Sequence, residues 1–329
     1  MRLFPIDRRF QAPLAAALVL ASLAVGCARA EPLARPPLVP SLLPLPLTLP
    51  GAPGLPRQAD GRHYPVVPTD PQALARLLTA VEQAVRDPAT ADAALPALGH
   101  QQQVIYRVLA TRPALAQQVL PLLASRWHSV AERAIAARRD FLAMHRGAPA
   151  RTVPAWRIVP PAPREALLRS YRRAAAATGI PWEVLAAVNL VETGLGRIDG
   201  ISVAGAQGPM QFLPSTWAEA GIGKGDIRNA DDAIQAAARY LVRRGGPSDL
   251  RRALWGYNNS DHYGRAVLLY ASLLREDPAI FRGLYQWEIH VPTVAGDVWL
   301  PVGYAQARRL PVQTYLRQVP ASTPPPLAP

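Results

Sequence analysis

The sequence predicts a mainly α-helical fold with one small β-hairpin near its C-terminal end. Hydrophobic residues recur at helical spacing over residues 70–147 and again over residues 163–284. Residues 285–304 instead alternate and are rich in Val, Trp and Tyr, which is typical of a hairpin. With 329 residues, half of them hydrophobic, the chain is long enough for about two domains with a proper core.

Residues 1–30 are predicted to be an export signal. Basic residues precede an apolar stretch over residues 13–26, which is short for a membrane span. Cys27 follows small residues directly after that stretch, a pattern that resembles a bacterial lipoprotein signal with Cys27 as the lipidated residue. The alternative is a plain secretory signal cleaved near residue 30. Either reading predicts an exported protein of the periplasm or cell envelope, and lipidation would add a membrane anchor.

Proline-rich composition marks the predicted linkers. Residues 31–69 are dense in proline and predict a semi-rigid spacer, because proline interrupts helices and central strands. Residues 148–162 read as a second linker between the helical region over 70–147, of unknown role, and the helical region over 163–284. Residues 285–318 are expected to hold the hairpin and an extension, and residues 319–329 a disordered tail.

Capping residues delimit the helices in order along the chain. Asp70 followed by Pro71 predicts a helix start, and Gly179 predicts the end of the helix that begins after Pro163. Pro181 opens the next helix, a short one follows near residues 213–221, and Asn229 caps a longer one. Two further helices end near residues 258 and 276. In the hairpin, residues 295–297 are the expected turn.

Glu192 is the residue that the helical pattern does not explain. It lies on the same stripe as Leu185, Val188 and Leu195, so its charged form would be partly desolvated. It also lies at the C-terminal end of its helix, where the helix dipole disfavours a negative charge. Both effects raise the pKa of a carboxyl group. A carboxylic acid that stays protonated near neutral pH is what cleavage of a glycosidic bond requires.

Two alternatives temper this interpretation of Glu192. The carboxylate could instead form an ion pair with a nearby arginine, such as Arg197 or Arg239. A conventional glycosidase also needs a second carboxylate at a defined separation. Asp199 is the nearest one in the sequence, and no acidic residue recommends itself for that role.

Three motifs then occur in order: Glu192-Thr193-Gly194, "SVAGAQGPMQFLPSTW" over residues 202–217 and "ALWGYNNSDHYGRAV" over residues 253–267. Together they resemble the motifs of bacterial lytic transglycosylases, over roughly residues 163–275. The resemblance implies an α+β, lysozyme-like catalytic domain. It also implies cleavage of the MurNAc–GlcNAc β-1,4 bond of peptidoglycan without hydrolysis, giving 1,6-anhydro-MurNAc ends. One glutamic acid acts first as acid and then as base, so no second carboxylate is needed.

The resemblance assigns Glu192 the catalytic role and implies substrate contacts for several other residues. Tyr257 would orient Glu192, Asn258 would bind the acetamido group, and Gln211 would contact sugar hydroxyls or N-acetyl groups. Ser202 would also belong to the substrate site, Met210 and Phe212 would supply apolar contact, and Gly205 and Gly208 would let a glycan strand approach the backbone. Plainer roles stay open: Met210 and Phe212 as core residues, Asn258 as a helix cap, and Tyr257 as packing.

Other function classes are less well supported by the sequence. The net charge of +13 favours anionic partners, yet no nucleic-acid-binding motif is visible and export argues against nucleic acid. One cysteine and six histidines without ligand spacing predict neither a metal site nor a cofactor. The remaining alternatives are a hydrolytic, lysozyme-like muramidase and a non-catalytic wall-binding protein on the same fold.

Overall fold

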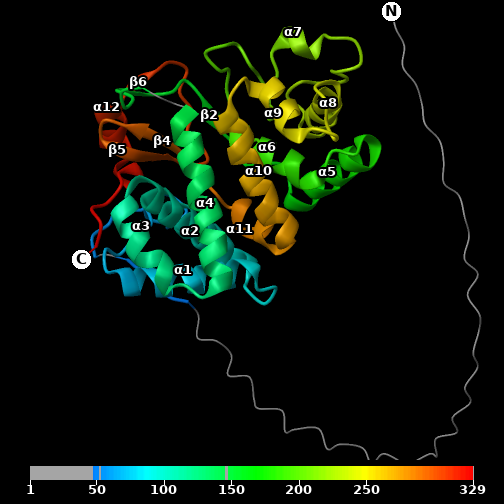
Figure 1. The fold of residues 1–329 in the computed structure, drawn as a ribbon. Helices are drawn as coiled ribbons and strands as arrows, with labels where there is room; N and C mark the ends of the chain where they lie inside the picture. Colours follow the sequence, from blue (N-terminus) through cyan, green and yellow to red (C-terminus); the bar gives the residue numbers. More distant parts are fainter. Residues whose placement is uncertain (1–46, 52, 145–146, 329) are drawn as a thin grey trace, which may run out of the picture. The chain divides into compact units, whose positions relative to one another are not determined.

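Helices make up most of the protein, and the fold is mainly α (Figure 1). The structure is a computed structural model that describes residues 47–51, 53–144 and 147–328. The predicted export signal, with Cys27, and residues 31–46 of the predicted spacer lie outside the described residues. The α-helices are α1 (Pro71–Arg86), α2 (Leu95–Thr111), α3 (Pro113–Val119), α4 (Ser125–Met144), α5 (Arg164–Thr178), α6 (Trp182–Thr193), α7 (Pro214–Trp217), α8 (Ala230–Arg243), α9 (Leu250–Asn258), α10 (Asp261–Glu276), α11 (Phe281–Leu284) and α12 (Val312–Gln318).

Short strands and 3-10 helices complete the chain. The strands are β1 (Thr152–Val153), β2 (Arg157–Ile158), β3 (Ile198–Asp199), β4 (Ile289–Thr293), β5 (Gly296–Leu300) and β6 (Leu310–Pro311). The 3-10 helices are η1 (Asp92–Ala94), η2 (Leu120–Leu122), η3 (Pro278–Ile280) and η4 (Pro320–Ser322). The strands form three antiparallel pairs, β1 with β6, β2 with β3, and β4 with β5.

The predicted helix caps are confirmed where the structure can test them. The Asp70 carboxylate accepts a hydrogen bond of 2.7 Å from the Ala73 amide at the start of α1. The Asn229 side chain accepts from two amides in the first turn of α8. Gly179 ends α5 at a φ of 76°, a left-handed conformation that glycine adopts at little cost. Local sequence therefore decides these helix ends.

The predicted hairpin is present as β4 and β5, with Ile289 opposite Leu300 and Thr293 opposite Gly296. Its turn lies one position earlier than predicted, at residues 294 and 295, and Gly296 with a φ of 94° begins the second strand. The Thr293 hydroxyl donates to the Gly296 carbonyl and accepts from the Ala295 amide. These two bonds stabilise a turn that begins one residue before the predicted one.

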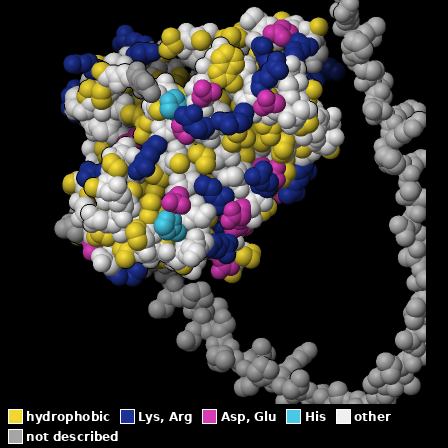
Figure 2. All heavy atoms as spheres, viewed as in Figure 1, with side chains coloured by type: hydrophobic (Ala, Val, Ile, Leu, Met, Phe, Trp, Pro, Cys, Tyr) yellow, Lys and Arg dark blue, Asp and Glu magenta, His cyan; other side chains and the backbone are white. Residues whose placement is uncertain are grey.

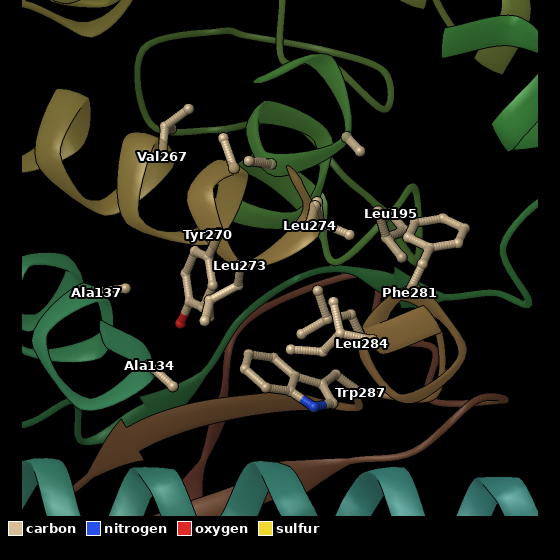
Figure 3. Packing of buried hydrophobic residues seen from close by; sticks show 14 of the residues in the cluster. Ala134, Ala137, Leu195, Val267, Tyr270, Leu273, Leu274, Phe281, Leu284 and Trp287 are labelled. Carbon is tan, nitrogen blue, oxygen red and sulfur yellow. The ribbon is translucent and has the colours of Figure 1, made fainter. Parts of the chain in front are cut away.

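One hydrophobic core joins the two helical regions that the sequence analysis separates. The core contains Val81, Leu109 and Ile135 from the first region and Leu185 and Val267 from the second, all in one cluster of buried residues. The reason is that α4 packs along α10, and α2 also packs against α11. In Figure 3, Tyr270 of α10 lies between α4, at Ala134 and Ala137, and the Trp287 ring. The region over 70–147 is thus part of the same folded body as residues 163–284.

Three segments predicted to be linker or tail contribute to this body, which corrects the predicted boundaries. Tyr64 and Val67 of the Pro-rich spacer are buried in the core. Val153 and Ile158, from the predicted second linker, are buried and lie in β1 and β2. The predicted tail buries Ala321. Proline excludes these segments from helices and central strands, but extended chain with apolar side chains still packs at the edge of a core.

The surface carries mixed charges. On the face in Figure 2, Lys and Arg side chains are spread among Asp and Glu side chains instead of gathering in one basic patch. Within the described part of the chain, no helix has the length and apolar character that crossing a membrane requires.

Candidate active site

Glu192 lies in the last turn of α6, a helix whose end is set by packing. Gly194 follows at a φ of 61° and caps the helix in the left-handed conformation. A Cβ added at Gly194 would come within 2.6 Å of the Ile289 Cδ1 atom, so a larger residue would displace that side chain in addition to straining the backbone. The sequence Glu-Thr-Gly therefore stops the helix directly after the carboxylic acid and brings the hairpin against it.

The Glu192 side chain is part of the lining of a cavity of about 780 Å³ and keeps a small exposed surface. Burial raises the pKa of Glu192 to about 7, the direction that the sequence predicts. The Tyr263 hydroxyl lies beside the carboxyl group and offsets part of this rise. The Tyr263 hydroxyl forms no hydrogen bond of regular geometry with any described residue. Glu192 is thus largely desolvated and about half protonated at neutral pH.

The alternative of an ion pair with Arg197 or Arg239 is not found. The Arg197 guanidinium donates to the Tyr285 carbonyl at 2.7 Å, and Arg239 donates to the Ile222 carbonyl at 2.8 Å. Neither arginine affects the pKa of Glu192. Among the described residues, its carboxyl group therefore has no cationic partner that would hold it ionised.

Two tyrosines, Tyr257 on α9 and Tyr263 on α10, lie near Glu192, whereas the sequence predicts this position for Tyr257 alone. The Tyr257 hydroxyl donates to the Met210 carbonyl at 2.8 Å and so fixes the glycine-rich loop, while burial and the charge of Glu192 raise the pKa of Tyr257. Tyr263, whose ring stacks on that of Tyr257 at 6.1 Å, is the tyrosine whose hydroxyl lies against the carboxyl group. Its motif was recognised in the sequence, but spacing alone does not show which tyrosine reaches Glu192.

The glycine-rich loop, residues 202–212, presents Gln211 to the cavity. Gln211 has a φ of 49°, unusual for a residue other than glycine, and its side chain donates to the Gly208 carbonyl at 3.0 Å. A Cβ at Gly208 would come within 2.0 Å of the Ile227 carbonyl oxygen. The close approach at Gly208 is therefore to the protein's own backbone, while the space around Gly205 is open.

The other predicted substrate residues separate into lining and core. Ser202 and Asn258 line the cavity, and the Ser202 hydroxyl also accepts from the Ala206 amide at 3.0 Å. Met210 and Phe212 are buried at 0% and 3% exposure, so Met210 is a core residue with no surface for a ligand, whereas Phe212 also lines a second cavity. The helix cap after α9 is Asn259, at a φ of 49°, which leaves the exposed Asn258 free of that role.

Two buried residues of α6 that the sequence analysis missed hold this loop. The Asn189 side-chain Nδ2 donates to the Pro209 carbonyl at 2.8 Å, and the Thr193 hydroxyl donates to the same carbonyl at 2.6 Å. The Tyr171 hydroxyl in turn donates to the Asn189 side-chain Oδ1 at 2.6 Å. The helix that carries Glu192 thereby fixes the loop that carries Gln211. In the sequence, the polar residue Asn189 on an otherwise apolar helix is the feature that could have indicated this buried contact.

Another part of the cavity lining comes from outside the recognised motifs. Arg107 of α2, Arg138 of α4 and Glu288 before β4 belong to it. Glu288 accepts from Arg62 at 2.8 Å and from the Trp299 indole at 3.4 Å. Asp199 pairs with Arg228 at 3.0 Å. Both carboxylates are thus held in ion pairs, whereas Glu192 is not.

A second cavity of about 410 Å³ adjoins the first through Gln211, which lines both. Half-exposed Trp255 and the side chain of Tyr240 belong to its lining. Within the described residues, no group of three or more His, Cys, Asp or Glu side chains is placed to hold a metal ion. Among the described residues, the site thus offers one acid outside an ion pair, Glu192, together with several hydrogen-bonding groups and two cavities that share Gln211.

Comparison with known proteins places this site in a family. Residues 169–268 match the family model of the transglycosylase SLT domain. A search of curated proteins and a search of solved structures found no match. The match spans α6, the glycine-rich loop, α9 and the first half of α10, which are the elements that carry Glu192, Gln211, Asn258 and Tyr263. The helical fold and the ordered motifs agree with it, and residues 169–268 of this protein are a lytic transglycosylase SLT domain.

Proposed function

We propose that this protein is an exported murein lytic transglycosylase. It cleaves the β-1,4 bond between MurNAc and GlcNAc without water and leaves 1,6-anhydro-MurNAc ends. The SLT domain implies a peptidoglycan substrate and cleavage of the transglycosylase type. The observation that carries the proposal is Glu192, a desolvated carboxylic acid without a cationic partner in the wall of a large cavity, with a pKa raised to about 7.

The proposed reaction uses Glu192 twice. Its proton passes to the glycosidic oxygen while the bond from that oxygen to the MurNAc C1 breaks. The resulting carboxylate then takes the proton of the MurNAc C6 hydroxyl as that oxygen bonds to C1. A pKa near the working pH suits both transfers, because the group must be a competent acid first and a competent base afterwards.

The surrounding residues have supporting roles in this proposal. Gln211 and Asn258, both in the cavity lining, would bind sugar hydroxyl or acetamido groups. Because Gln211 lines both cavities, a glycan strand would extend from one into the other. Tyr263 would stabilise the anionic form of Glu192 after the first proton transfer, since it lies beside the carboxyl group.

Product analysis tests the proposal. Purified peptidoglycan is incubated with the protein, and the released muropeptides are identified by mass spectrometry. We expect anhydro ends from the parent protein and no release from Glu192→Gln, which keeps the shape but removes the acid. Glu183→Gln, in the first turn of the same helix and outside the cavity lining, is the matched control and should cleave normally.

Two other outcomes would replace the proposal. Reducing MurNAc ends would mean hydrolysis by a lysozyme-like muramidase. Binding to the wall without any release would mean a non-catalytic wall-binding protein. Cleavage by Glu192→Gln at the parent rate would remove Glu192 from the mechanism.

Export and lipidation belong to the same proposal. The N-terminal sequence supports an exported protein, and a lipid on Cys27 would anchor it to a membrane. Cell fractionation of the parent and of Cys27→Ala separates the two readings. If Cys27 is lipidated, the variant moves from the membrane to the soluble envelope fraction. A plain secretory signal would leave both proteins in the same fraction.

A further inference from the structure

Arg138 of α4 is a buried cation without a counter-ion in the wall of the cavity. It lies outside the matched SLT domain, and its side chain is 9% exposed. Its Nε has no hydrogen-bond partner among the described residues. Its guanidinium lies over the Phe141 ring, at 5.0 Å from the ring centre. No ion pair in the described part of the chain includes Arg138.

The neighbouring Arg107 lines the same cavity but, unlike Arg138, has a carboxylate partner. Its Nε and Nη2 atoms donate to the two carboxylate oxygens of Asp297, each at 2.5 Å. This bidentate pair balances the charge of Arg107 and occupies Asp297. The local charge is therefore uneven, because two arginines share one carboxylate.

The cost of this arrangement points to a missing partner. Burial and the charge of Arg107 lower the pKa of Arg138 to about 9, so Arg138 still carries its charge at neutral pH. A buried charge normally has a counter-ion, because desolvation without one is unfavourable. The guanidinium and Glu192 line the same cavity, so a ligand bound at Glu192 has access to Arg138.

We propose that Arg138 binds a carboxylate of the muramoyl unit of the substrate. This inference rests on the proposed function, and it assigns the helical region outside the SLT domain a part in substrate recognition. The carboxylate is that of the lactyl group in glycan without peptides, or one on the stem peptide where peptides remain. A planar guanidinium with two free donor edges matches a carboxylate, which binds arginine in a bidentate geometry.

Binding measurements with three ligands test the inference. Each ligand is titrated calorimetrically into Glu192→Gln protein, so that no cleavage occurs. The ligands are a GlcNAc tetramer without a carboxylate, a GlcNAc–MurNAc tetrasaccharide with free lactyl groups, and the same tetrasaccharide carrying stem peptides. We expect at least one muramoyl ligand to bind about tenfold or more tightly than the GlcNAc tetramer. The ligand that gains affinity identifies the carboxylate.

Adding Arg138→Met should remove this preference and leave the affinity for the GlcNAc tetramer unchanged. Arg133→Met is the matched control, because Arg133 lies on the same helix but bonds to Glu276 and Ser272 and does not line the cavity. It should keep the full preference. Arg138→Lys, which retains the charge without the guanidinium fork, should keep part of it and serves if the Met variant does not fold.

The possible failures are distinguishable. Equal affinity for all three ligands in the parent, or a preference that survives Arg138→Met, overturns the role of Arg138 and leaves the proposed function intact. The role of Arg138 would also be overturned if Arg138→Lys kept the full preference for muramoyl ligands while Arg133→Met lost it. Absence of binding to every ligand overturns this inference and the proposed function together.

Discussion

The two walls of the main cavity each contain one buried ionisable group without a counter-ion, and the two groups differ in how they are neutralised. Glu192, in the part of the lining that belongs to the SLT domain, becomes neutral when it is protonated, and its pKa is raised to about 7. Arg138, on the α4 wall, stays charged because its pKa is lowered only to about 9. A buried acid of this kind is suited to proton transfer, whereas a buried guanidinium needs an anion from outside. Under the two proposals above, Glu192 serves the chemistry and Arg138 serves recognition of the substrate.

The walls also differ in how they are held in place. On the SLT side, buried hydrogen bonds from Asn189 and Thr193 fix the backbone of the substrate loop. On the other side, α4 packs along α10 with small apolar residues such as Ala134 and Ala137 (Figure 3). The hydrogen-bonded wall should therefore respond more to polar substitutions than the packed one.

The largest expected effect concerns the wall that contains Glu192 and the pH dependence of that residue. The first step needs protonated Glu192, and the protonated fraction falls about tenfold per pH unit above the pKa of about 7. We expect the rate of muropeptide release at limiting substrate to fall about fiftyfold between pH 7 and pH 9. Circular dichroism at each pH verifies that the protein stays folded. A rate that is flat to pH 9 would contradict the assignment of Glu192 as the acid.

The second prediction tests the hydrogen-bonded support of that wall. Asn189→Ala removes the bonds to Pro209 and Tyr171, which leaves the buried Tyr171 hydroxyl unpaired and the Pro209 carbonyl with its bond from Thr193 alone. We expect the free energy of unfolding to drop by about 3 kcal/mol. Chemical denaturation measures it, and Asn258→Ala at the exposed end of α9 should change it by less than about 0.5 kcal/mol. Equal effects of the two variants would mean that Asn189 does not support the wall.

The third prediction uses the sign of the Glu192 shift. Because its pKa is raised in the folded state, folding favours the protonated form, and this contribution is complete below about pH 4.5. It is lost progressively as the pH rises through 7. Glu192→Gln should therefore stabilise the protein by about 3 kcal/mol at pH 8 and have little effect at pH 4.5. Thermal unfolding at both pH values measures the difference. A gain of the same size at both would rule out proton linkage.

The smallest expected effect comes from the wall that contains Arg138. Removing an uncompensated buried charge relieves its desolvation cost, so Arg138→Met should raise the free energy of unfolding by about 1 kcal/mol. Arg133→Met, which breaks a partly exposed ion pair with Glu276, should lower it by less than about 1 kcal/mol. If Arg138→Met instead destabilises the protein by several kcal/mol, Arg138 supports the fold and is not held ready for a ligand.

Much of the local structure could be predicted because it depends on neighbours in the sequence. The cap at Asp70, the end of α5 at Gly179 and the strands of the hairpin follow from rules that operate over a few residues. Asp297 shows the limit of such rules. It was assigned to a turn, yet it lies in β5 and pairs with Arg107, 190 positions away.

For the candidate site, the sequence by itself determined the desolvated position of Glu192, because the apolar stripe and the helix end are both written into α6 and the glycine after it. Only the tertiary structure decided that the Tyr263 hydroxyl lies beside the acid while the Tyr257 hydroxyl bonds to the Met210 carbonyl, and that Met210 is core. It also decided that α4 contributes Arg138 to the same cavity. The physical reason is distance along the chain: these contacts arise from helices that pack together across the core, and no periodicity within one helix specifies which partner it will meet.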